Sequence, residues 1–248
     1  MLPRLDWGEQ IILITGGASG IGSILAKTMA IRNVGHPTIL INSAGVVQGK
    51  LITELSPEDV KQTFDTNVLS HFWILNTFLP HMIQRGAGHI VTLGSILGLV
   101  GVAQMTDYSA SKAALNNLHE SLRYELDKRH KTPRIRTTLV LPGHTLTPLF
   151  SRMSLPEAFW YKFFVPSLPP HMVTKAIIAA LDNQESGTIY MPFYTHFVPM
   201  IKVLPSFCRD FFQWVSQADY SMRGFVKVTA RRPEEGEIPP EEKRSKSE

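Results

Sequence analysis

A short stretch near the N-terminus, 11-IILITGGASGIG-22, decides the fold class of this chain. Residues 11–14 form an unbroken apolar run, typical of a buried strand, and a glycine cluster follows directly. Glycines permit a tight turn and let backbone N–H groups approach a phosphate at the start of the next helix. We therefore expect a strand over 11–14 and a helix over about 20–32. An ordinary strand-to-helix turn is the alternative interpretation of the glycines.

The rest of the chain continues this alternation of apolar runs and helical patterns, which is typical of parallel βαβ units. Ser56 and Pro57 mark the start of one helix, because a capping serine followed by proline and acidic residues suits a helix N-terminus. That helix is expected to reach residue 85, with breaks near residues 65–67 and at Pro80. The other expected strands cover 38–41, 89–93, 135–141 and 188–191, and the other expected helices cover 108–130 and 173–183.

Composition indicates a single globular domain. The 248 residues suffice for one sizeable core, which we assign to 1–230, and the charged, proline-containing residues 231–248 are expected to form a disordered tail. The net charge of +4 is mild, and no basic cluster is long enough to predict nucleic-acid binding. Cys208 is the only cysteine, which excludes a disulfide within the chain and favours a reducing compartment. The nine histidines lack zinc-ligand spacing, so no metal is expected, and residues 1–10 contain no apolar stretch for a signal peptide or anchor.

Residues 189–215 form the most lipophilic region, and they are rich in phenylalanine. Prolines and charged residues interrupt the region, so it is not expected to form one membrane-spanning helix. One interpretation is a membrane-facing surface or the lid of a lipophilic substrate site. The other, which we slightly prefer, is packing in the core or at a dimer interface.

Tyr108 and Lys112 lie four residues apart on an expected helix, so they project from the same face. A nearby ammonium favours the phenolate and would let the phenol exchange a proton nearer neutral pH. Such a pair alone is usually a surface feature. Ser95 strengthens the functional interpretation, because it follows the expected strand 89–93 at the carboxyl edge where open α/β sheets bind ligands.

In combination, these features resemble the short-chain dehydrogenase/reductase family. The matching motifs are 15-TGGASGIG-22, Ser95 and 108-YSASK-112, together with 42-NSAG-45, Asn67 and 142-PG-143. Serine at position 43 is a mild departure, since the family usually has asparagine there. Residues 49–73, 98–101 and 119–122 look most like the retinol and 17β-hydroxysteroid dehydrogenase branch. Members of that branch act on lipophilic alcohols and ketones and are commonly membrane-associated.

The resemblance implies an oxidoreductase that uses NAD or NADP. Tyr108 would transfer the proton, Lys112 would lower the pKa of the phenol and hold the nicotinamide ribose, and Ser95 would orient the substrate oxygen. Asn67 would hold a water that links Lys112 to solvent. Residues 149–170 would cover the substrate. The residues implied to contact the cofactor are Thr15, Gly16, Ser19, Gly20, Ile21, Gly22, Asn42, Ala44, Gly45, Asn67, Tyr108, Lys112, Pro142, Gly143 and Thr147.

One spacing departs from the family pattern. Only 27 positions separate Thr15 from Asn42, and one βαβ unit takes about 30 residues. The space therefore holds a single crossover helix, where a complete dinucleotide-binding half would have two further strands. We expect a Rossmann-like, doubly wound parallel α/β sheet that lacks two strands of its first half. The strand over 11–14 would then be an exposed apolar edge, and the residue that selects NAD or NADP would be absent.

The leading functional prediction is an NAD(P)-dependent oxidoreductase acting on a lipophilic alcohol or ketone. The alternative is an impaired pseudoenzyme or scaffold, since we expect the missing strands to weaken cofactor binding strongly. A skipped exon or a faulty gene model would also explain the short spacing. The resemblance further implies a homodimer formed through the helices at 57–85 and 108–130, with peripheral membrane contact on the cytoplasmic side, at the endoplasmic reticulum or lipid droplets.

Overall fold

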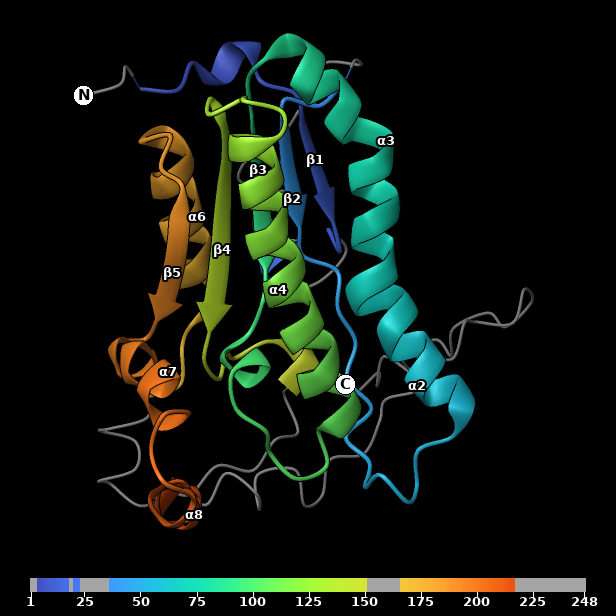
Figure 1. The fold of residues 1–248 in the computed structure, drawn as a ribbon, viewed down its shortest axis with the longest axis vertical. Coiled ribbons are helices and arrows are strands. Elements are labelled where there is room, and N and C mark those ends of the chain that lie inside the picture. The colour runs from blue at the N-terminus through green and yellow to red at the C-terminus, as the bar shows by residue number, and fades with distance from the viewer. Residues whose placement is uncertain (1–3, 18–19, 23–35, 151–165, 217–248) are drawn as a thin grey trace, which may run out of the picture.

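The chain forms a five-stranded sheet in which all neighbouring strands are parallel (Figure 1). The computed structural model describes residues 4–17, 20–22, 36–150 and 166–216. Within these ranges the strands are β1 (Ile12–Thr15), β2 (Ile39–Asn42), β3 (Gly88–Leu93), β4 (Ile135–Pro142) and β5 (Gly187–Met191). Their spatial order follows their order along the chain, β1-β2-β3-β4-β5. Each expected strand is present within one residue of its predicted bounds.

The first strand pairs directly with the second, as the short spacing predicted. Ile12 lies opposite Ile39, and Thr15 lies opposite Asn42. No strand of the described residues lies beyond β1, so β1 is an edge strand and its side chains are only half-buried, whereas those of β2 are all buried. Residues 20–22 are helical, as expected after the glycine turn, and the remainder of the predicted crossover, 23–35, lies outside the described residues.

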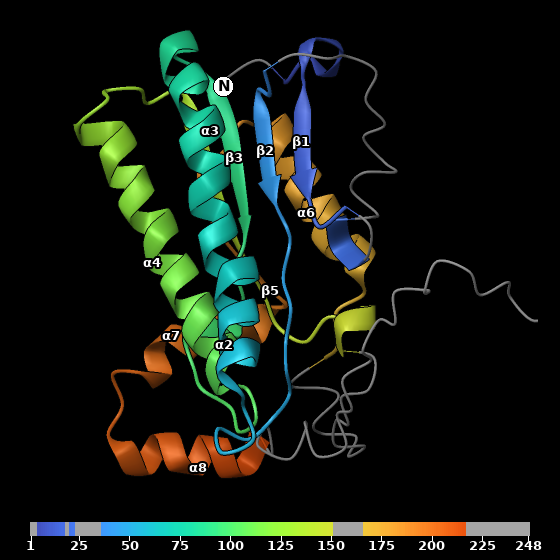
Figure 2. The same cartoon turned by 90° about the vertical axis from the view of Figure 1, so that its right-hand side faces the viewer.

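A layer of long helices covers one face of the sheet (Figure 2). It contains α2 (Pro57–Phe64), the π-helical turn η2 (Asp65–Leu69), α3 (Ser70–Arg85) and α4 (Thr106–Lys128). Leu75 and Met82 of α3 and Leu122 and Leu126 of α4 pack on Leu40 and Ile90 of the sheet, which places an apolar core between the two layers. The helix α2 begins with a capping box, in which the Ser56 side chain accepts from the backbone N–H of Asp59.

The two expected breaks in this helical stretch have different outcomes. The deviation near residues 65–67 is confirmed, since residues 65–69 form the π-helical turn. The break at Pro80 is wrong, because α3 continues through it to Arg85. Pro80 and Asn76 lie on the exposed side, where water can bond the Asn76 carbonyl that the proline leaves without a donor. Gly86 ends the helix with φ of 70°, a conformation that favours glycine.

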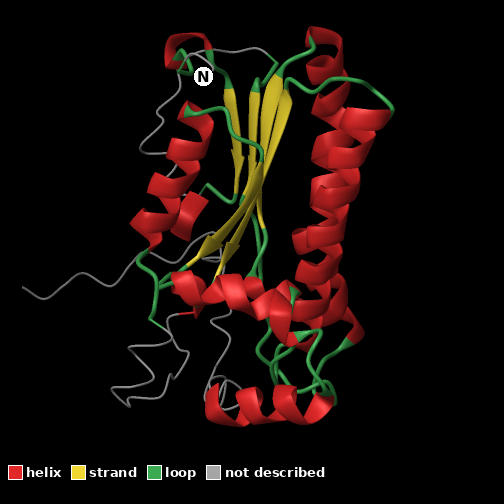
Figure 3. Ribbon diagram, turned by 60° about the vertical axis from the view of Figure 1, so that its left-hand side comes forward, coloured by secondary structure: helices red, strands yellow, loops and turns green. Residues whose placement is uncertain are grey.

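The helix α6 (Pro170–Asp182) covers the opposite face of the sheet (Figure 3). Val173, Ile177 and Leu181 pack there against Ile39 and Val140, which point away from the α3–α4 layer. Helices on both faces and a parallel sheet confirm the predicted Rossmann-like class. Short helices complete the described part: η1 (Trp7–Glu9), η3 (Ile96–Gly98), η4 (Pro148–Phe150), η5 (Phe193–Phe197), α7 (Val198–Ile201) and α8 (Ser206–Ser216).

The lipophilic C-terminal region follows β5 and lies beyond the end of the sheet to which the strand arrows point (Figures 1 and 3). Its large apolar side chains are exposed, with fractions from 53% at Phe197 to 83% at Val203. Packing in the core is therefore wrong for these side chains, because they contact mainly solvent. None of the described helices is long and apolar enough to cross a membrane. The exposed set is Phe193, Phe197, Met200, Val203, Phe207, Phe211 and Trp214.

Candidate active site

A pocket of about 350 Å³ opens at the carboxyl ends of β1 to β4. Parallel sheets place ligands at this edge, because the loops that follow the strands meet there. The glycine turn, the loop after β2, the end of β3, the first turns of α4 and the segment after β4 all contribute walls. The lining residues are Gly16, Gly20, Ile21, Ser43, Ala44, Gly45, Thr66, Leu93, Gly94, Ser95, Tyr108, Lys112, Pro142, Gly143, Thr145, Thr147, Pro148, Leu149 and Phe150.

Tyr108 lies in the first turn of α4 with its ring in an apolar environment. Val47 and Met105 pack against it, and the Phe150 ring lies edge-on with its centroid 5.9 Å away. This burial raises the pKa of the phenol to about 12, since the charged phenolate is disfavoured away from water. A hydrogen bond with Ser95 lowers the pKa of the phenol and so opposes part of that effect.

Lys112 follows one helical turn later, and its side chain is buried in the same pocket. Its Nζ donates to the backbone oxygen of Leu93 at 2.7 Å and lies 5.8 Å from the centroid of the Tyr108 ring. Burial lowers the pKa of Lys112 to about 8. The predicted proximity of the two side chains is confirmed. Burial raises the pKa of the phenol in this geometry, and the expected lowering of that pKa by Lys112 stays a prediction.

Ser95 is positioned by the turn that follows β3. It caps η3, where its Oγ accepts from the backbone N–H of Leu97 at 3.1 Å. The cap holds the serine in extended backbone geometry at the carboxyl end of β3. Ser95, Tyr108 and Lys112 therefore meet in one pocket, although they come from two separate elements.

Asn67 holds the walls together instead of lining the pocket. Its amide exchanges two hydrogen bonds with the backbone of Val46, donating to the oxygen at 3.0 Å and accepting from the N–H at 2.8 Å. The same Nδ2 donates to Ser111 Oγ at 2.9 Å. These bonds connect η2, the loop after β2 and α4. The expected role of Asn67 in holding a water stays a prediction, and its side chain already has these three protein partners.

The residues predicted to contact the cofactor fall into three groups. Gly16, Gly20, Ile21, Ala44, Gly45, Pro142, Gly143 and Thr147 line the pocket. Thr15, Gly22 and Asn42 are not among its lining residues, and Thr15 Oγ1 accepts from the backbone N–H groups of Ser43 and Ala44, which line it, at 3.1 and 3.3 Å. Ser19 lies outside the described residues, as do residues 151–165 of the predicted substrate cover.

Several lining residues were not predicted from the sequence. Ser43 and Gly94 are neighbours of predicted positions, so the motifs already pointed to their backbone. Thr66 is likewise the neighbour of the predicted Asn67. Thr145 carried no comparable signal, because its approach to the pocket depends on the path of the chain after β4. In the described part of the chain, no three histidine, cysteine or acidic side chains gather as metal ligands would.

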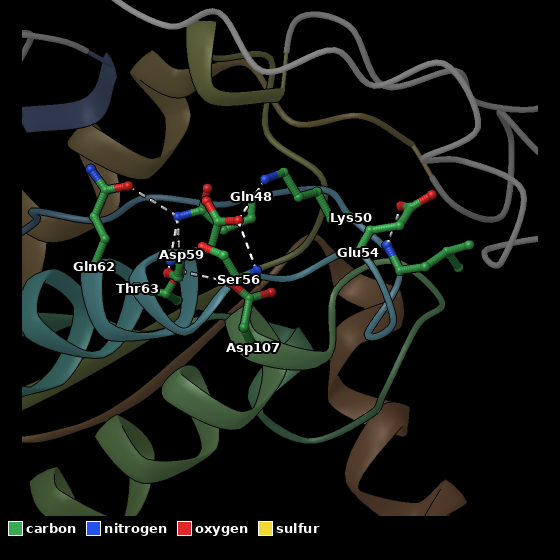
Figure 4. A network of polar contacts seen from close by, with 9 residues as sticks. Gln48, Lys50, Glu54, Ser56, Asp59, Gln62, Thr63 and Asp107 are labelled. Atoms are coloured by element: carbon green, nitrogen blue, oxygen red, sulfur yellow. Dashed lines mark hydrogen bonds and ion pairs between the residues drawn. The ribbon is translucent and has the colours of Figure 1, made fainter.

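A polar network supports the start of α4 from the side of α2 (Figure 4). Thr63 Oγ1 donates to the buried carboxylate of Asp107 at 2.7 Å, and Gln48 Nε2 donates to Thr63 Oγ1 at 3.2 Å. Lys50 pairs with Asp59 at 2.5 Å in the same region. The N-terminus of α4 has no side-chain cap, so the Asp107 carboxylate in its first turn offsets the positive end of the helix dipole. This network fixes the turn that carries Tyr108, and no sequence pattern predicted it.

Comparison with protein families identifies a match. Residues 29–158 match the family model described as short chain dehydrogenase. The chain is 34% identical to epidermal retinol dehydrogenase 2 of Mus musculus, covering 82% of this chain and 81% of that protein. It is 38% identical to retinol dehydrogenase 10 of Rattus norvegicus and 35% identical to short-chain dehydrogenase/reductase family 16C member 6 of Bos taurus, covering 62% and 71% of this chain.

The chain spans about half the length of the curated relatives it matches first, 54% of the bovine protein and 44% of the rat protein. The alignment with the mouse protein covers 255 positions, more than the 248 residues of this chain, so it includes segments that this chain lacks. These relatives confirm the predicted likeness to the retinol dehydrogenase branch.

Solved structures share the fold at lower sequence identity. A short chain dehydrogenase from Burkholderia cenocepacia J2315, in complex with NADP, superposes with a TM-score of 0.67 at 22% identity, covering 86% of this chain and 99% of that chain. A 4-hydroxyisoleucine dehydrogenase mutant, complexed with NADH and succinate, gives a TM-score of 0.63 at 21% identity, with 73% and 96% covered. Both likenesses support the Rossmann-like architecture.

Proposed function

This chain belongs to the short-chain dehydrogenase family, and from that premise we propose that it is an NAD(P)-dependent oxidoreductase acting on a lipophilic alcohol or ketone. The observation that carries the proposal is the meeting of Ser95, Tyr108 and Lys112 in one pocket with the glycine turn. A phenol hydrogen-bonded to a serine can pass a proton to or from a substrate oxygen that the serine orients.

The residues of the pocket fit the nicotinamide end and the pyrophosphate of a dinucleotide. Gly16 has φ of 68°, and a Cβ there would lie 2.8 Å from the backbone nitrogen of Ala44, so the turn needs glycine to close against the loop after β2. When bound, the nicotinamide would supply or accept the hydride. Lys112 would hold ribose hydroxyls, Tyr108 would move the proton at its phenol oxygen, and Gly143 would lie beside the carboxamide.

The apolar side of the pocket supports a lipophilic substrate. Leu97, Leu149 and Phe150 pack around Tyr108, so the wall nearest the phenol is hydrocarbon and aromatic. Such a wall favours burial of an apolar skeleton at about 25 cal/mol per Å² of apolar area. Retinoids, steroids and similar secondary metabolites present this kind of surface, with one hydroxyl or carbonyl as the polar handle for Ser95.

The test is turnover of the purified chain with NADPH or NADH and a panel of retinoid and steroid alcohols and ketones. Tyr108→Phe should reduce kcat by about 100-fold or more, because it removes the group that transfers the proton. Tyr124→Phe is the matched control, since Tyr124 lies on the same helix with 58% of its surface exposed. Equal activity of the two variants would refute the proposed role of Tyr108.

A second candidate function is a scaffold that has lost catalysis. The observation that favours it is the direct pairing of β1 with β2, because the adenosine side of a dinucleotide normally rests on the strands beyond β1. A folded chain that shows no turnover with any member of the panel would support the scaffold. Turnover lost with Tyr108→Phe would support the enzyme.

We also propose peripheral membrane contact through the exposed C-terminal residues. Phe207, Phe211 and Trp214 follow one another at four and three residues along α8, so they form one exposed stripe, and Lys202 and Arg209 offer cations to lipid phosphates. This contact would place the chain on the cytoplasmic side of the endoplasmic reticulum or a lipid droplet. Wild-type chain should float with phosphatidylcholine–phosphatidylserine vesicles, and Phe211→Ser/Trp214→Ser should not.

The control for flotation lies on α3. Phe72→Ser/Trp73→Ser removes side chains that are 47% and 59% exposed, and it should leave flotation unchanged.

The exposed side chains of Phe72 and Trp73 also support a proposed homodimer through α3 and α4, since exposed aromatic side chains on long helices are typical of interface anchors. Trp73→Glu should lower the mass of the chain in sedimentation if the dimer forms through this face, and an unchanged mass would contradict it.

A further inference from the structure

The side chain of Asn116 lies between two glycines that flank Ser95. Asn116 is buried on α4, one turn after Lys112 and on the same face. A Cβ on Gly94 would lie 2.6 Å from its Oδ1, and a Cβ on Gly98 would lie 2.5 Å from its Nδ2. The amide is therefore packed against both ends of the segment 94–98 that carries Ser95.

This contact explains why the segment begins and ends with glycine. Any side chain at Gly94 or Gly98 would overlap the amide, since real Cβ atoms do not approach heavy atoms so closely. At Gly98 a Cβ would also lie 2.8 Å from the backbone carbon and oxygen of Lys112. The turn after β3 thus rests directly on α4, and a thin planar amide sets its height above the helix.

The amide gains little stability from this position. Among the described residues, neither Oδ1 nor Nδ2 of Asn116 has a hydrogen-bond partner, although both atoms are buried. Each unpaired buried polar atom lowers stability, because it has given up its hydrogen bonds to water without gaining new ones. Leucine recurs on the buried face of this helix and would be the ordinary choice for a core position. A polar side chain that costs stability beside reactive groups is better explained by function than by folding.

We propose that Asn116 is a positioning residue that holds the Ser95 hydroxyl at the height needed to reach the phenol of Tyr108. The proposal rests on the proposed oxidoreductase function. Asn116 sets the turn sterically through Gly94 and Gly98, and the turn in turn sets Ser95. A smaller side chain leaves space beside Gly94 and Gly98, so the turn pivots about its contact with the backbone of Lys112 and samples several positions. This loss of order moves Ser95 away from the tyrosine oxygen.

The first experiment measures the order of the turn without any turnover. In the native turn, the amides of Leu97, Gly98 and Leu99 donate to Ser95 Oγ, Ser95 O and Ile96 O. Asn116→Ala should speed hydrogen exchange at these three amides by about tenfold, since local opening sets their protection. Asn117→Ala removes the same amide from an exposed position and should leave the three rates unchanged. Unchanged rates in Asn116→Ala would overturn the proposal.

The second experiment is a double-mutant cycle with Ser95. Asn116→Ala should lower kcat by about 10- to 100-fold, with the KM for the cofactor unchanged, because a shift of about 1 Å in a catalytic group costs that much. In a Ser95→Ala background the same change should have no further effect, since Asn116 acts through the serine. An additive loss of activity would overturn the proposal, because it would indicate a general structural role.

These experiments separate the proposal from the proposed function. A wild-type chain without turnover refutes the oxidoreductase, and the exchange rates then still decide whether Asn116 sets the turn. If Asn116→Ala does not fold, Asn116→Ser replaces it in both experiments. Serine lacks the planar amide, so the same acceleration of exchange is expected, and its absence counts against the proposal.

Discussion

Burial controls the two ionisable groups at the centre of the pocket. It raises the pKa of Tyr108 to about 12 and lowers the pKa of Lys112 to about 8. Both shifts favour the neutral side chain. The phenol therefore keeps its proton, and the ammonium is held at a cost to folding, which is the pattern of a site that trades stability for chemistry.

Replacing Lys112 should show that cost directly. Unfolded lysine has a pKa of 10.5, so a folded pKa of about 8 means that the native chain releases this proton first. The charged side chain destabilises the fold fully below pH 8, and the penalty shrinks as pH rises from 8 to 10.5. We expect Lys112→Met to raise the free energy of unfolding at pH 7 by about 1–3 kcal/mol after loss of the bond to Leu93.

The measurement is urea unfolding of both proteins at pH 7 and pH 10, with turnover in parallel. Lys112→Met should be inactive and more stable at pH 7, and its advantage should be smaller at pH 10. Lys128→Met, at the end of the same helix and exposed, is the control. A less stable Lys112→Met at pH 7 would contradict this prediction.

His71 should make the fold less stable at acidic pH. It is buried on α3, and burial together with the nearby charge of Lys112 lowers its pKa from 6.5 to about 3. The unfolded chain takes up this proton below pH 6.5 and the native chain does not until about pH 3, so stability falls as pH falls through that range. Lowering the pH from 7 to 5 should cost wild-type chain about 2 kcal/mol more than His71→Leu.

Urea unfolding at the two pH values measures this difference, and His130→Leu, an exposed position, serves as the control. A His71→Leu variant with the wild-type pH dependence would show that another group accounts for acid sensitivity. His89 and His119 are buried with pKa values lowered to about 4, so a remaining acid sensitivity is expected in the variant.

At this scale, spacing predicted which side chains meet but not how they ionise. The four-residue step from Tyr108 to Lys112 required a shared helix face, and the end of β3 required Ser95 to lie at the ligand edge. The direction of the phenol pKa depends on Val47 and Phe150, which are distant in the chain and join Tyr108 only in the folded core. The amide of Asn116 was missed for the same reason.

Among the elements, the π-helical turn η2 connects the most parts of the site. It places Asn67 where the side chain bonds both backbone groups of Val46 and also Ser111. A π-turn adds a residue to the helix and so turns one side chain inward, and such turns often occur at functional sites. The sequence predicted a break near residues 65–67, and the π-helical turn lies at that place.

Asn67→Ala should destabilise the chain by about 1–3 kcal/mol, because it leaves part-buried backbone groups of Val46 and the buried Ser111 hydroxyl without the amide that bonds them. The loss should be accompanied by faster proteolysis of the loop at residues 43–50, which the asparagine ties to η2. Asn76→Ala, an exposed position on α3, is the control for thermal and urea unfolding. Equal stability of the two variants would mean that water replaces the side chain of Asn67.

The elements show where sequence patterns succeed. Each of the five strands was expected within one residue of its position, because continuous apolar runs bounded by glycine, proline or polar residues mark buried parallel strands. The predicted break at Pro80 was wrong, because a proline on the solvent side of a helix removes one backbone hydrogen bond that water can replace. Core packing of the apolar residues on α8 was a wrong prediction, because apolar composition alone does not distinguish a core helix from a surface helix.

The molecule as a whole combines a pocket that gathers Ser95, Tyr108 and Lys112 with a shortened first half of the sheet. The pocket includes the glycine turn and these three of the four catalytic candidates, yet β1 is the edge of the described sheet. Adenosine normally rests on strands beyond this edge. We therefore expect weak dinucleotide binding, with most contacts made to the nicotinamide half.

Reduced nicotinamide mononucleotide tests this expectation. Its Kd for the chain should lie within about tenfold of the Kd for NADH or NADPH, since a difference of about 1.4 kcal/mol or less remains for the adenosine half. Calorimetric titration measures the three affinities, and Tyr124→Phe should not change them. Dinucleotide binding that is tighter than the mononucleotide by several orders of magnitude would indicate an adenosine site and overturn the weak-binding hypothesis.

The agreement between strand order and chain order has a consequence for biosynthesis. From β2 onward, each described strand pairs with the strand that precedes it in the chain, so every new strand finds a partner that has already been translated. Proteins are made from the N-terminus, and contacts between neighbours along the chain form faster than distant ones. We expect this sheet to form one strand at a time as the chain leaves the ribosome. In a sheet of another strand order, a strand that is translated later must insert between two earlier strands, so those two cannot pair until it emerges.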